Sequence, residues 1–180
     1  MNNHYFIGIK TPSSIEDTVR HYKEKYNLAS AYKAIPHMDD LHITLLFIGA
    51  LSKERIPHLK QELDAVVSQH KEFNLSVSGL SFFGSPKGPR VVYLSVEASP
   101  QLYALQQSIA AIGRKDFGIE IDKRFTPHIT IAKKRKSVGD FAIPKETYPP
   151  IEFIVDGFSL FTIHPSKSPK YEIIEHFSFE

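Results

Sequence analysis

The sequence contains no cysteine, which excludes disulfide bonds, thiolate nucleophiles and metal sites built on cysteine. No apolar run approaches the roughly 20 residues that are needed to cross a bilayer. The first residues, Met1–Ile9, lack the basic region and the small-residue cleavage site of a signal peptide. We therefore expect a soluble, cytoplasmic protein without a membrane partner, and the lack of cysteine fits a reducing compartment.

The chain also has little excess charge of either sign, with a formal net charge of +2. Positive charge is concentrated in Lys133-Lys134-Arg135-Lys136, but such a run is by itself more typical of a solvated face than of a binding patch. The apolar fraction of 42% and the charged fraction of 23% are ordinary for a globular protein. A length of 180 residues suits a single domain over residues 1–180, or two small lobes that share a core.

Apolar periodicity predicts an α+β fold. We expect strands at residues 5–9, 41–48, 73–83, 90–96, 126–132 and 171–179, and one more over residues 151–163 that is bent at Gly157. Helices are expected from about residue 13 to 26, from residue 52 through 67, and from 100 to about 115. The prolines at 144, 149 and 150 indicate a loop. The order strand, helix, histidine-containing strand occurs in the first half and again from Arg90 to Ala132, which suggests a duplication.

Histidine followed two residues later by serine or threonine occurs four times in the chain. With 9 His, 7 Thr and 17 Ser in 180 residues, composition alone predicts roughly one such triplet, so the bare triplet is weak evidence. His164 lies in a Ser/Pro/Lys loop and His176 lies close to the C-terminus. Only His42 and His128 occur as His-Ile-Thr-apolar within a clear strand, and we interpret these two as the functional pair.

Strand geometry explains why these two copies differ from the others. Side chains at positions i and i+2 of a strand lie on the same face, so each histidine shares a face with its threonine, Thr44 or Thr130. The isoleucine between them lies on the opposite, buried face. A single such pair is more often a hydrogen-bonded structural histidine. Two pairs at corresponding positions of similar halves favour a functional site instead.

Two imidazoles and two hydroxyls can open a cyclic phosphate without a metal or another cofactor. One neutral histidine accepts a proton from water, and one protonated histidine gives a proton to the leaving oxygen. The threonine hydroxyls can donate hydrogen bonds to the non-bridging phosphate oxygens.

These motifs resemble the signatures of a known family. Leu41-His-Ile-Thr-Leu-Leu-Phe-Ile-Gly49 and Phe125-Thr-Pro-His-Ile-Thr-Ile-Ala-Lys133 are similar to the paired signatures of the two-histidine phosphoesterases. Within that superfamily they most resemble the bacterial RNA 2′,3′-cyclic phosphodiesterases, also called 2′-5′ RNA ligases. The strand Phe6-Ile-Gly-Ile9 with Pro12, and Pro89-Arg-Val-Val-Tyr-Leu-Ser-Val96, fit that family's opening and middle strands.

The resemblance implies a bilobal fold with a pseudo-twofold pair of βαβ-rich halves, intertwined into one domain. Two mainly antiparallel sheets would enclose a central cleft. It implies that His42 donates a proton, that His128 activates water, and that Thr44 and Thr130 hold the phosphate. The substrates would be RNA ends or nucleotides with a 2′,3′-cyclic phosphate, the product a 2′-phosphate, and ligation the reverse reaction. No obligate protein partner is indicated.

The chain departs from the family's pattern at two places. The family often has arginine three residues after the second threonine, where this chain has Lys133, which keeps the charge but loses the bidentate fork. The chain has no tryptophan, and Tyr93 stands where relatives often place one in the middle strand. Tyr93, Phe125 or Phe83 could stack on a base, although each is at least as often a core residue.

Three alternatives remain open at this point. The same residues could act on a small cyclic nucleotide or an ADP-ribose cyclic phosphate. The chain could be a non-catalytic RNA- or nucleotide-binding module, although binding alone needs no acid–base pair. A metal could bind between His42 and His128, but metal sites usually need at least three protein ligands, and Asp39 and Asp40 lie in an expected turn.

Overall fold

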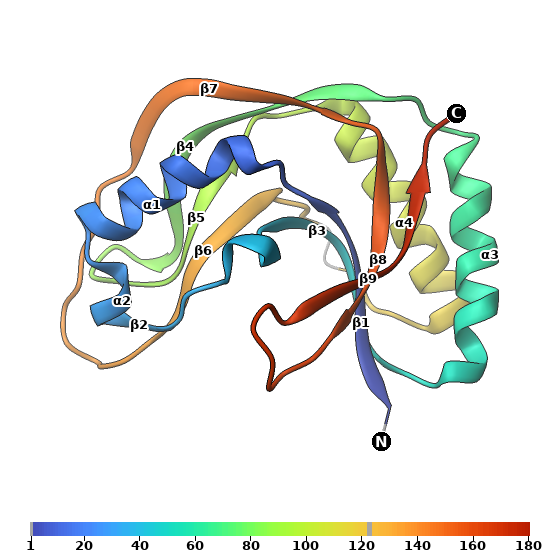
Figure 1. The fold of residues 1–180 in the computed structure, drawn as a ribbon, viewed down its shortest axis with the longest axis horizontal. Coiled ribbons are helices and arrows are strands. Elements are labelled where there is room, and N and C mark those ends of the chain that lie inside the picture. The colour runs from blue at the N-terminus through green and yellow to red at the C-terminus, as the bar shows by residue number, and fades with distance from the viewer. Residues whose placement is uncertain (1, 122–123) are drawn as a thin grey trace.

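A computed structural model describes residues 2–121 and 124–180 of the chain. In these residues the chain forms nine β-strands and four α-helices (Figure 1). The strands are β1 (Asn3–Lys10), β2 (Tyr32–Ala34), β3 (His42–Leu51), β4 (Phe73–Ser85), β5 (Gly88–Val96), β6 (His128–Arg135), β7 (Glu146–Val155), β8 (Gly157–Ile163) and β9 (Tyr171–Ser178). The helices are α1 (Glu16–Lys25), α2 (Leu28–Ala31), α3 (Ile56–Val67) and α4 (Pro100–Phe117).

The strands form two antiparallel sheets, which confirms the predicted α+β class. One sheet has four strands in the order β3-β1-β8-β9, and the other has five in the order β2-β6-β5-β4-β7. Every strand pairing is antiparallel. One continuous cluster of buried apolar side chains draws on both sheets and on the helices that cover them.

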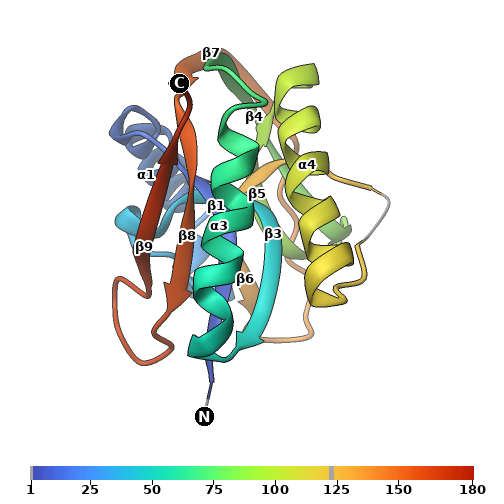
Figure 2. The same ribbon diagram turned by 90° about the vertical axis from the view of Figure 1, so that its right-hand side faces the viewer.

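Each half of the chain supplies a helix that covers the sheet of the other half. Helix α1 follows β1 of the four-stranded sheet but packs beside β7 of the five-stranded one, where Tyr22 lies 5.9 Å from the Tyr148 ring. Helix α4 follows β5 of the five-stranded sheet but packs on β3, with Gly113 close against Leu46. Figure 2 shows α3 and α4 side by side over the four-stranded sheet.

The predicted repetition of strand, helix and histidine strand is present in both sheets. β1 and β3 are antiparallel neighbours in one sheet, and β5 and β6 are antiparallel neighbours in the other. In the first pair Lys10 lies opposite His42, and in the second Ser95 lies opposite His128. Each histidine is the first residue of its strand, so both motifs occupy equivalent positions.

The prediction for residues 144–163 was wrong in two respects. Residues 151–163 were expected as one bent strand, but β7 belongs to the five-stranded sheet and β8 to the other, with Asp156 between them. The expected proline loop is in part strand, because β7 begins at Glu146 and includes Pro149 and Pro150. Proline is tolerated here because β7 is an edge strand whose register shifts between Val77 and Gly79 of β4.

Two short elements, β2 and α2, were not predicted, because three and four residues give no periodic signal. Strand β3 continues through Gly49, where the prediction ended it. Gly49 has a positive φ of 81° and lies opposite Tyr5, next to a register irregularity in the β1–β3 pair. A glycine with this conformation marks a bulge rather than the end of the strand. In the part of the chain that is described, no helix has the length and apolar character needed to span a bilayer.

Candidate active site

The two His-Ile-Thr motifs have the alternation of side chains that was expected. Ile43 and Ile129 have no exposed surface, whereas the histidine and threonine of each motif are half-buried on the other face of the strand. Gly8 of β1 lies opposite Thr44, and a methyl group on Gly8 would come within 2.6 Å of the Ile43 carbonyl oxygen. The close approach of β1 and β3 at the first motif therefore requires glycine at this position.

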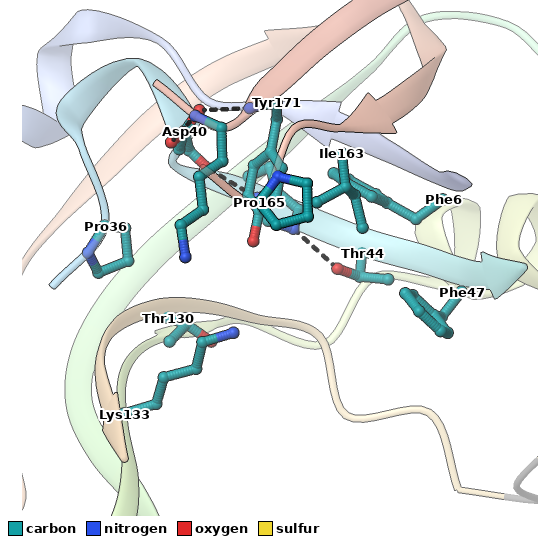
Figure 3. A pocket seen from close by; sticks show the side chains of 12 residues that line it. Phe6, Pro36, Asp40, Thr44, Phe47, Thr130, Lys133, Ile163, Pro165 and Tyr171 are labelled. Atoms are coloured by element: carbon teal, nitrogen blue, oxygen red, sulfur yellow. Dashed lines mark hydrogen bonds between the residues drawn. The ribbon is translucent and has the colours of Figure 1, made fainter. Parts of the chain in front are cut away.

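A cavity of about 320 Å³ between the sheets is bordered by His42 and Thr44 of the first motif and by Thr130 of the second, whereas His128 is not among its lining residues. Figure 3 shows Thr44 and Phe47 on β3 across the cavity from Thr130 and Lys133 on β6. The complete lining comprises Phe6, Pro36, Asp40, His42, Thr44, Phe47, Thr130, Lys133, Ile163, Pro165, Lys170 and Tyr171. Strands from both sheets thus place two hydroxyls, an imidazole and two ammonium groups around the same space.

The His42 ring is held by hydrogen bonds at both nitrogens. The distance from Nδ1 to the Asp40 carbonyl oxygen is 2.7 Å, and because a carbonyl can only accept, Nδ1 carries a proton. Nε2 lies 2.9 Å from Thr44 Oγ1. In the neutral ring Nε2 therefore accepts a hydrogen bond from the Thr44 hydroxyl, and in the protonated ring it can donate.

The His128 ring is oriented in the same way. Its Nδ1 donates to the carbonyl oxygen of Thr126, two residues earlier, at 2.8 Å. The ring packs against Phe83 and Tyr93, with centroid distances of 5.0 and 5.2 Å. In both motifs the carbonyl of residue i−2 fixes the tautomer, so Nε2 is the nitrogen left for proton transfer.

Burial makes both imidazoles harder to protonate. Burial is the main cause that lowers the pKa of His42 to about 4, and the charges of His128 and Lys133 lower it further. The Asp40 carbonyl and carboxylate act in the opposite direction, raising the pKa of His42. Burial also lowers the pKa of His128, against the effect of the Thr126 carbonyl. A positive charge on His128 thus makes His42 harder to protonate, although burial has the larger effect.

Asp40 was not identified from the sequence as part of the site. It ends a short 3-10 helix, Met38–Asp40, and only 5% of its surface is exposed. Its carboxylate accepts hydrogen bonds from the backbone N–H groups of Lys170 (2.8 Å) and Tyr171 (3.1 Å). Since its carbonyl holds His42, Asp40 ties the start of β9 to the first motif. No local signal reveals this role, because Asp40 and Lys170 are 130 residues apart in the chain.

Aromatic rings also surround His42. Phe6 lies 4.7 Å from the imidazole centroid and Tyr171 lies edge-on at 5.2 Å. These rings exclude water from the histidine, which accounts for the low pKa of its side chain. The sequence analysis did not propose Phe6 or Tyr171 for the site, although Phe6 belongs to a strand that resembles the family's opening strand.

Of the three aromatic candidates for base stacking, none lines this cavity. Tyr93 is only 8% exposed and supports the His128 ring. Phe83 lies 4.4 Å from Tyr93 and contacts the same imidazole. Phe125 borders a separate apolar hollow beside the N-terminus of α4, together with Tyr103. The exposed ring in the cavity is Phe47, with 56% of its surface accessible.

Possible metal ligands gather away from the two motifs. His58 and Glu62, one turn apart on α3, and Asp116 on α4 have ligand atoms within 4.8 Å of one another. In residues 2–121 and 124–180, no third histidine or carboxylate is grouped in this way with His42 and His128. The hypothesis of a metal between the two histidines therefore has no complete ligand set in the described residues.

The comparisons with known proteins agree in family and fold. Residues 11–166 match the model of the 2′-5′ RNA ligase superfamily. The chain is 30% identical over 177 residues to an RNA 2′,3′-cyclic phosphodiesterase of Bacillus subtilis (strain 168), a match that covers 97% of this chain and 95% of the relative. It is 28% identical to a protein of the same name from Geobacillus stearothermophilus, of which it spans 57%.

Solved structures show the same fold at lower identity. A crystal structure of a Thermus thermophilus protein superposes with a TM-score of 0.84 at 24% identity, covering 98% of this chain and 97% of that one. Escherichia coli LigT in complex with 3′-AMP superposes with a TM-score of 0.80 at 20% identity, covering 99% of both chains. Since the family model covers most of the chain and the Bacillus match nearly all of it, this protein belongs to the 2′-5′ RNA ligase superfamily.

Proposed function

We propose that this protein is a metal-independent RNA 2′,3′-cyclic phosphodiesterase that converts a 2′,3′-cyclic phosphate end to a 2′-phosphate. The observation that carries the proposal is the matched orientation of the two imidazoles. Each Nδ1 is held by the carbonyl of residue i−2, and His42, Thr44 and Thr130 border one cavity. Relatives named RNA 2′,3′-cyclic phosphodiesterase support the reaction and the substrate class.

In this reaction water attacks the phosphorus while His128 Nε2 accepts a proton from it. The bond from phosphorus to the 3′ oxygen breaks, and His42 Nε2 gives its proton to that oxygen. The product has a 2′-phosphate and a free 3′-hydroxyl, and the two histidines have exchanged protonation states. A proton transferred back through solvent restores the starting state.

The low pKa of His42 restricts how it can act as the acid. Because that pKa is about 4, the free protein holds a neutral His42 at neutral pH. A bound cyclic phosphate brings a negative charge next to the ring, and an opposite charge at short distance favours the protonated form. The substrate would therefore help to protonate the group that cleaves it, and the Thr44 hydroxyl would then accept from Nε2 or turn to a phosphate oxygen.

Thr130 and Lys133 complete the phosphate site in this proposal. Both line the cavity from β6, opposite Thr44. The threonine hydroxyls donate to the non-bridging oxygens, and the Lys133 ammonium supplies the positive charge for which the family often uses arginine. If the 5′-hydroxyl of a second RNA replaced water as the nucleophile, the same proton transfers would form a 2′-5′ linkage. The RNA ends would be encountered in the cytoplasm.

The test is hydrolysis of an oligonucleotide ending in a 2′,3′-cyclic phosphate, with a chelator present. Wild-type protein should release a 2′-phosphate, and His42→Ala and His128→Ala should each lose about 10²- to 10⁴-fold in rate, the usual contribution of general acid–base catalysis. His21→Ala, on the exposed face of α1, is the matched control. Turnover that survived both histidine substitutions would refute the mechanism, and a 3′-phosphate product would refute the assigned leaving group.

A further inference from the structure

A second hollow of about 400 Å³ opens beside the reaction cavity and is lined by four lysines. We call this hollow, bordered by Lys33, Ala34, Ile35, Pro36, His37, Asp40, Lys133, Lys134, Ser168, Lys170 and Tyr171, the lysine pocket. It shares Lys133, Lys170 and Asp40 with the reaction cavity. A group bound in the lysine pocket is thus next to the reacting phosphate.

The backbone of β6 is bent out of regular strand geometry to build this pocket. Neighbouring side chains of a strand point to opposite faces, so Lys133 and Lys134 would not ordinarily line the same hollow. Lys134 has φ 62°, a left-handed conformation that is unfavourable for a residue other than glycine by about 1–2 kcal/mol. This conformation interrupts the alternation, and both lysines border the pocket. Backbone strain of this kind concentrates at functional sites.

Strand β2 brings a third lysine to the same place. In the pairing of β2 with β6, Tyr32 lies opposite Arg135 and Ala34 lies opposite Lys133. Lys33 is therefore between these pairs, facing the position of Lys134. Two like charges in facing positions of neighbouring strands destabilise a sheet. The fourth lysine, Lys170, comes from the connection between β8 and β9.

In the described residues, the four lysines of the pocket outnumber its carboxylates, because Asp40 is the one acidic residue in the lining. The ion pairs recorded for residues 2–121 and 124–180 involve none of the four lysines. Asp40 borders the pocket, and its carboxylate, which accepts hydrogen bonds from two backbone N–H groups, offsets only part of the four positive charges. Burial lowers the pKa of Lys133, and the charges of Lys134 and Lys170 lower it further. The pocket thus carries an excess of positive charge that an anion would offset.

We propose that the lysine pocket binds a second phosphate group of the substrate, the internal phosphodiester next to the reacting end of an RNA strand. This inference rests on the proposed function. Phosphate groups follow one another along an RNA strand, and Lys133 borders both hollows, so adjacent phosphates can occupy them together. A mononucleoside cyclic phosphate has no second phosphate and would leave the lysine pocket empty. The pocket therefore selects RNA ends over small cyclic nucleotides.

Three substrates separate the possible sources of that phosphate. They are adenosine 2′,3′-cyclic phosphate, its 5′-phosphorylated form, and the dinucleotide ApA ending in a 2′,3′-cyclic phosphate. We expect wild-type kcat/KM to be at least about tenfold higher for the dinucleotide than for the bare mononucleotide, since several charged contacts of up to about 1 kcal/mol each are added. If kcat/KM for the 5′-phosphorylated mononucleotide equalled that for the dinucleotide, the proposal of an internal phosphodiester would be overturned. The lysine pocket would then bind a terminal phosphate.

Lys33→Gln and Lys134→Gln test the pocket without altering residues of the reaction cavity. Each should lower kcat/KM for the dinucleotide about 3- to 5-fold more than for the bare mononucleotide. The dependence of the dinucleotide reaction on salt should also weaken, because fewer counterions are released on binding. Lys71→Gln, at an exposed position after α3, is the matched control and should change neither substrate's rate. Equal losses for all three substrates, or no loss, would overturn the proposal.

Failure of the proposed function would look different from failure of this inference. A protein that turned over none of the three substrates would refute the phosphodiesterase function. The pocket would then be tested by the binding of a short fluorescent RNA strand, measured by anisotropy. Weaker binding by Lys33→Gln and Lys134→Gln, with Lys71→Gln unchanged, would support an anion site for RNA, and equal binding by all three would overturn it. Thermal unfolding should show that both pocket variants are folded.

Discussion

The two motifs share a local design, but their surroundings differ. In both, the carbonyl of residue i−2 holds Nδ1 of the histidine. His42 lies beneath Phe6 and Tyr171 and has a pKa of about 4, whereas His128 rests on the Tyr93 ring at a less enclosed position. The same backbone geometry therefore yields two histidines of different proton affinity. Burial creates that difference, and it leaves His42, the proposed proton donor, as the ring that is harder to protonate in the free protein.

The largest expected effect of this difference is on stability below neutral pH. Unfolded His42 takes up a proton as the pH falls below its ordinary pKa of 6.5, but folded His42 does so only near pH 4. The free energy of unfolding therefore falls with pH through this window, by about 2 kcal/mol at pH 5 and about 3 kcal/mol at pH 4. His42→Asn should remove this loss, as measured by urea unfolding at pH 7.5 and pH 5.

His128→Asn and His21→Asn are the comparisons for that experiment. The pKa of His128 is also lowered by burial, so His128→Asn should remove a smaller part of the acid-dependent loss of stability. His21 is exposed on α1, and its substitution should leave the pH dependence as in wild type. If His42→Asn lost as much stability on acidification as wild type, the protonation of His42 would not be linked to folding.

The residues before the two histidines show a second difference. Asp40 and Thr126 both supply the carbonyl that holds a ring, but only the Asp40 side chain accepts hydrogen bonds from a distant segment. Asp40→Ala should destabilise the protein by about 2 kcal/mol, because two N–H groups lose a charged acceptor. We also expect kcat to fall about tenfold as Tyr171 and His42 lose their fixed positions. Thr126→Ala should stay within about 0.5 kcal/mol of wild type.

Asp40→Asn separates positioning from simple destabilisation. The amide keeps one acceptor oxygen, so it should restore part of the activity, and KM should change less than kcat. A variant whose kcat recovered fully whenever the protein was kept folded, for example at low temperature, would show that Asp40 acts on stability alone. Equal effects of Asp40→Ala and Thr126→Ala on unfolding would remove the proposed asymmetry between the halves.

Features that depend on neighbouring residues could be predicted from the sequence, and features that depend on residues far apart in the chain could not. The shared face of His42 and Thr44 follows from strand alternation, a property of two neighbouring residues, and it was predicted. Asp40 was missed because its partner Lys170 is 130 residues away. The separation of β7 from β8 into different sheets has a similar origin, since a short connection at Asp156 does not show which sheet each strand joins. The left-handed conformation of Lys134 gives no signal in residue type, because glycine would be expected there.

The two halves also differ at the third residue after each threonine. Substitutions at this position should have the smallest effect of those considered, and they should act on KM. This position is the exposed Phe47 after Thr44 and the half-buried Lys133 after Thr130, and both line the reaction cavity (Figure 3). An aromatic side chain and a cation on opposite strands match the two parts of a nucleotide, its base and its phosphate. Phe47→Ala and Lys133→Met should each raise KM about fivefold, equivalent to about 1 kcal/mol.

Salt dependence distinguishes the two contributions even where the changes in KM are equal. Stacking on Phe47 releases no counterions, so Phe47→Ala should leave the slope of log KM against log salt concentration as in wild type. Lys133→Met should make that slope shallower, because one cation no longer contacts a phosphate. Lys133→Arg should keep the wild-type slope and lower KM, since the guanidinium binds phosphate through two parallel hydrogen bonds. If Phe47→Ala changed the salt dependence of KM as much as Lys133→Met does, the assignment of Phe47 to the base and Lys133 to the phosphate would be wrong.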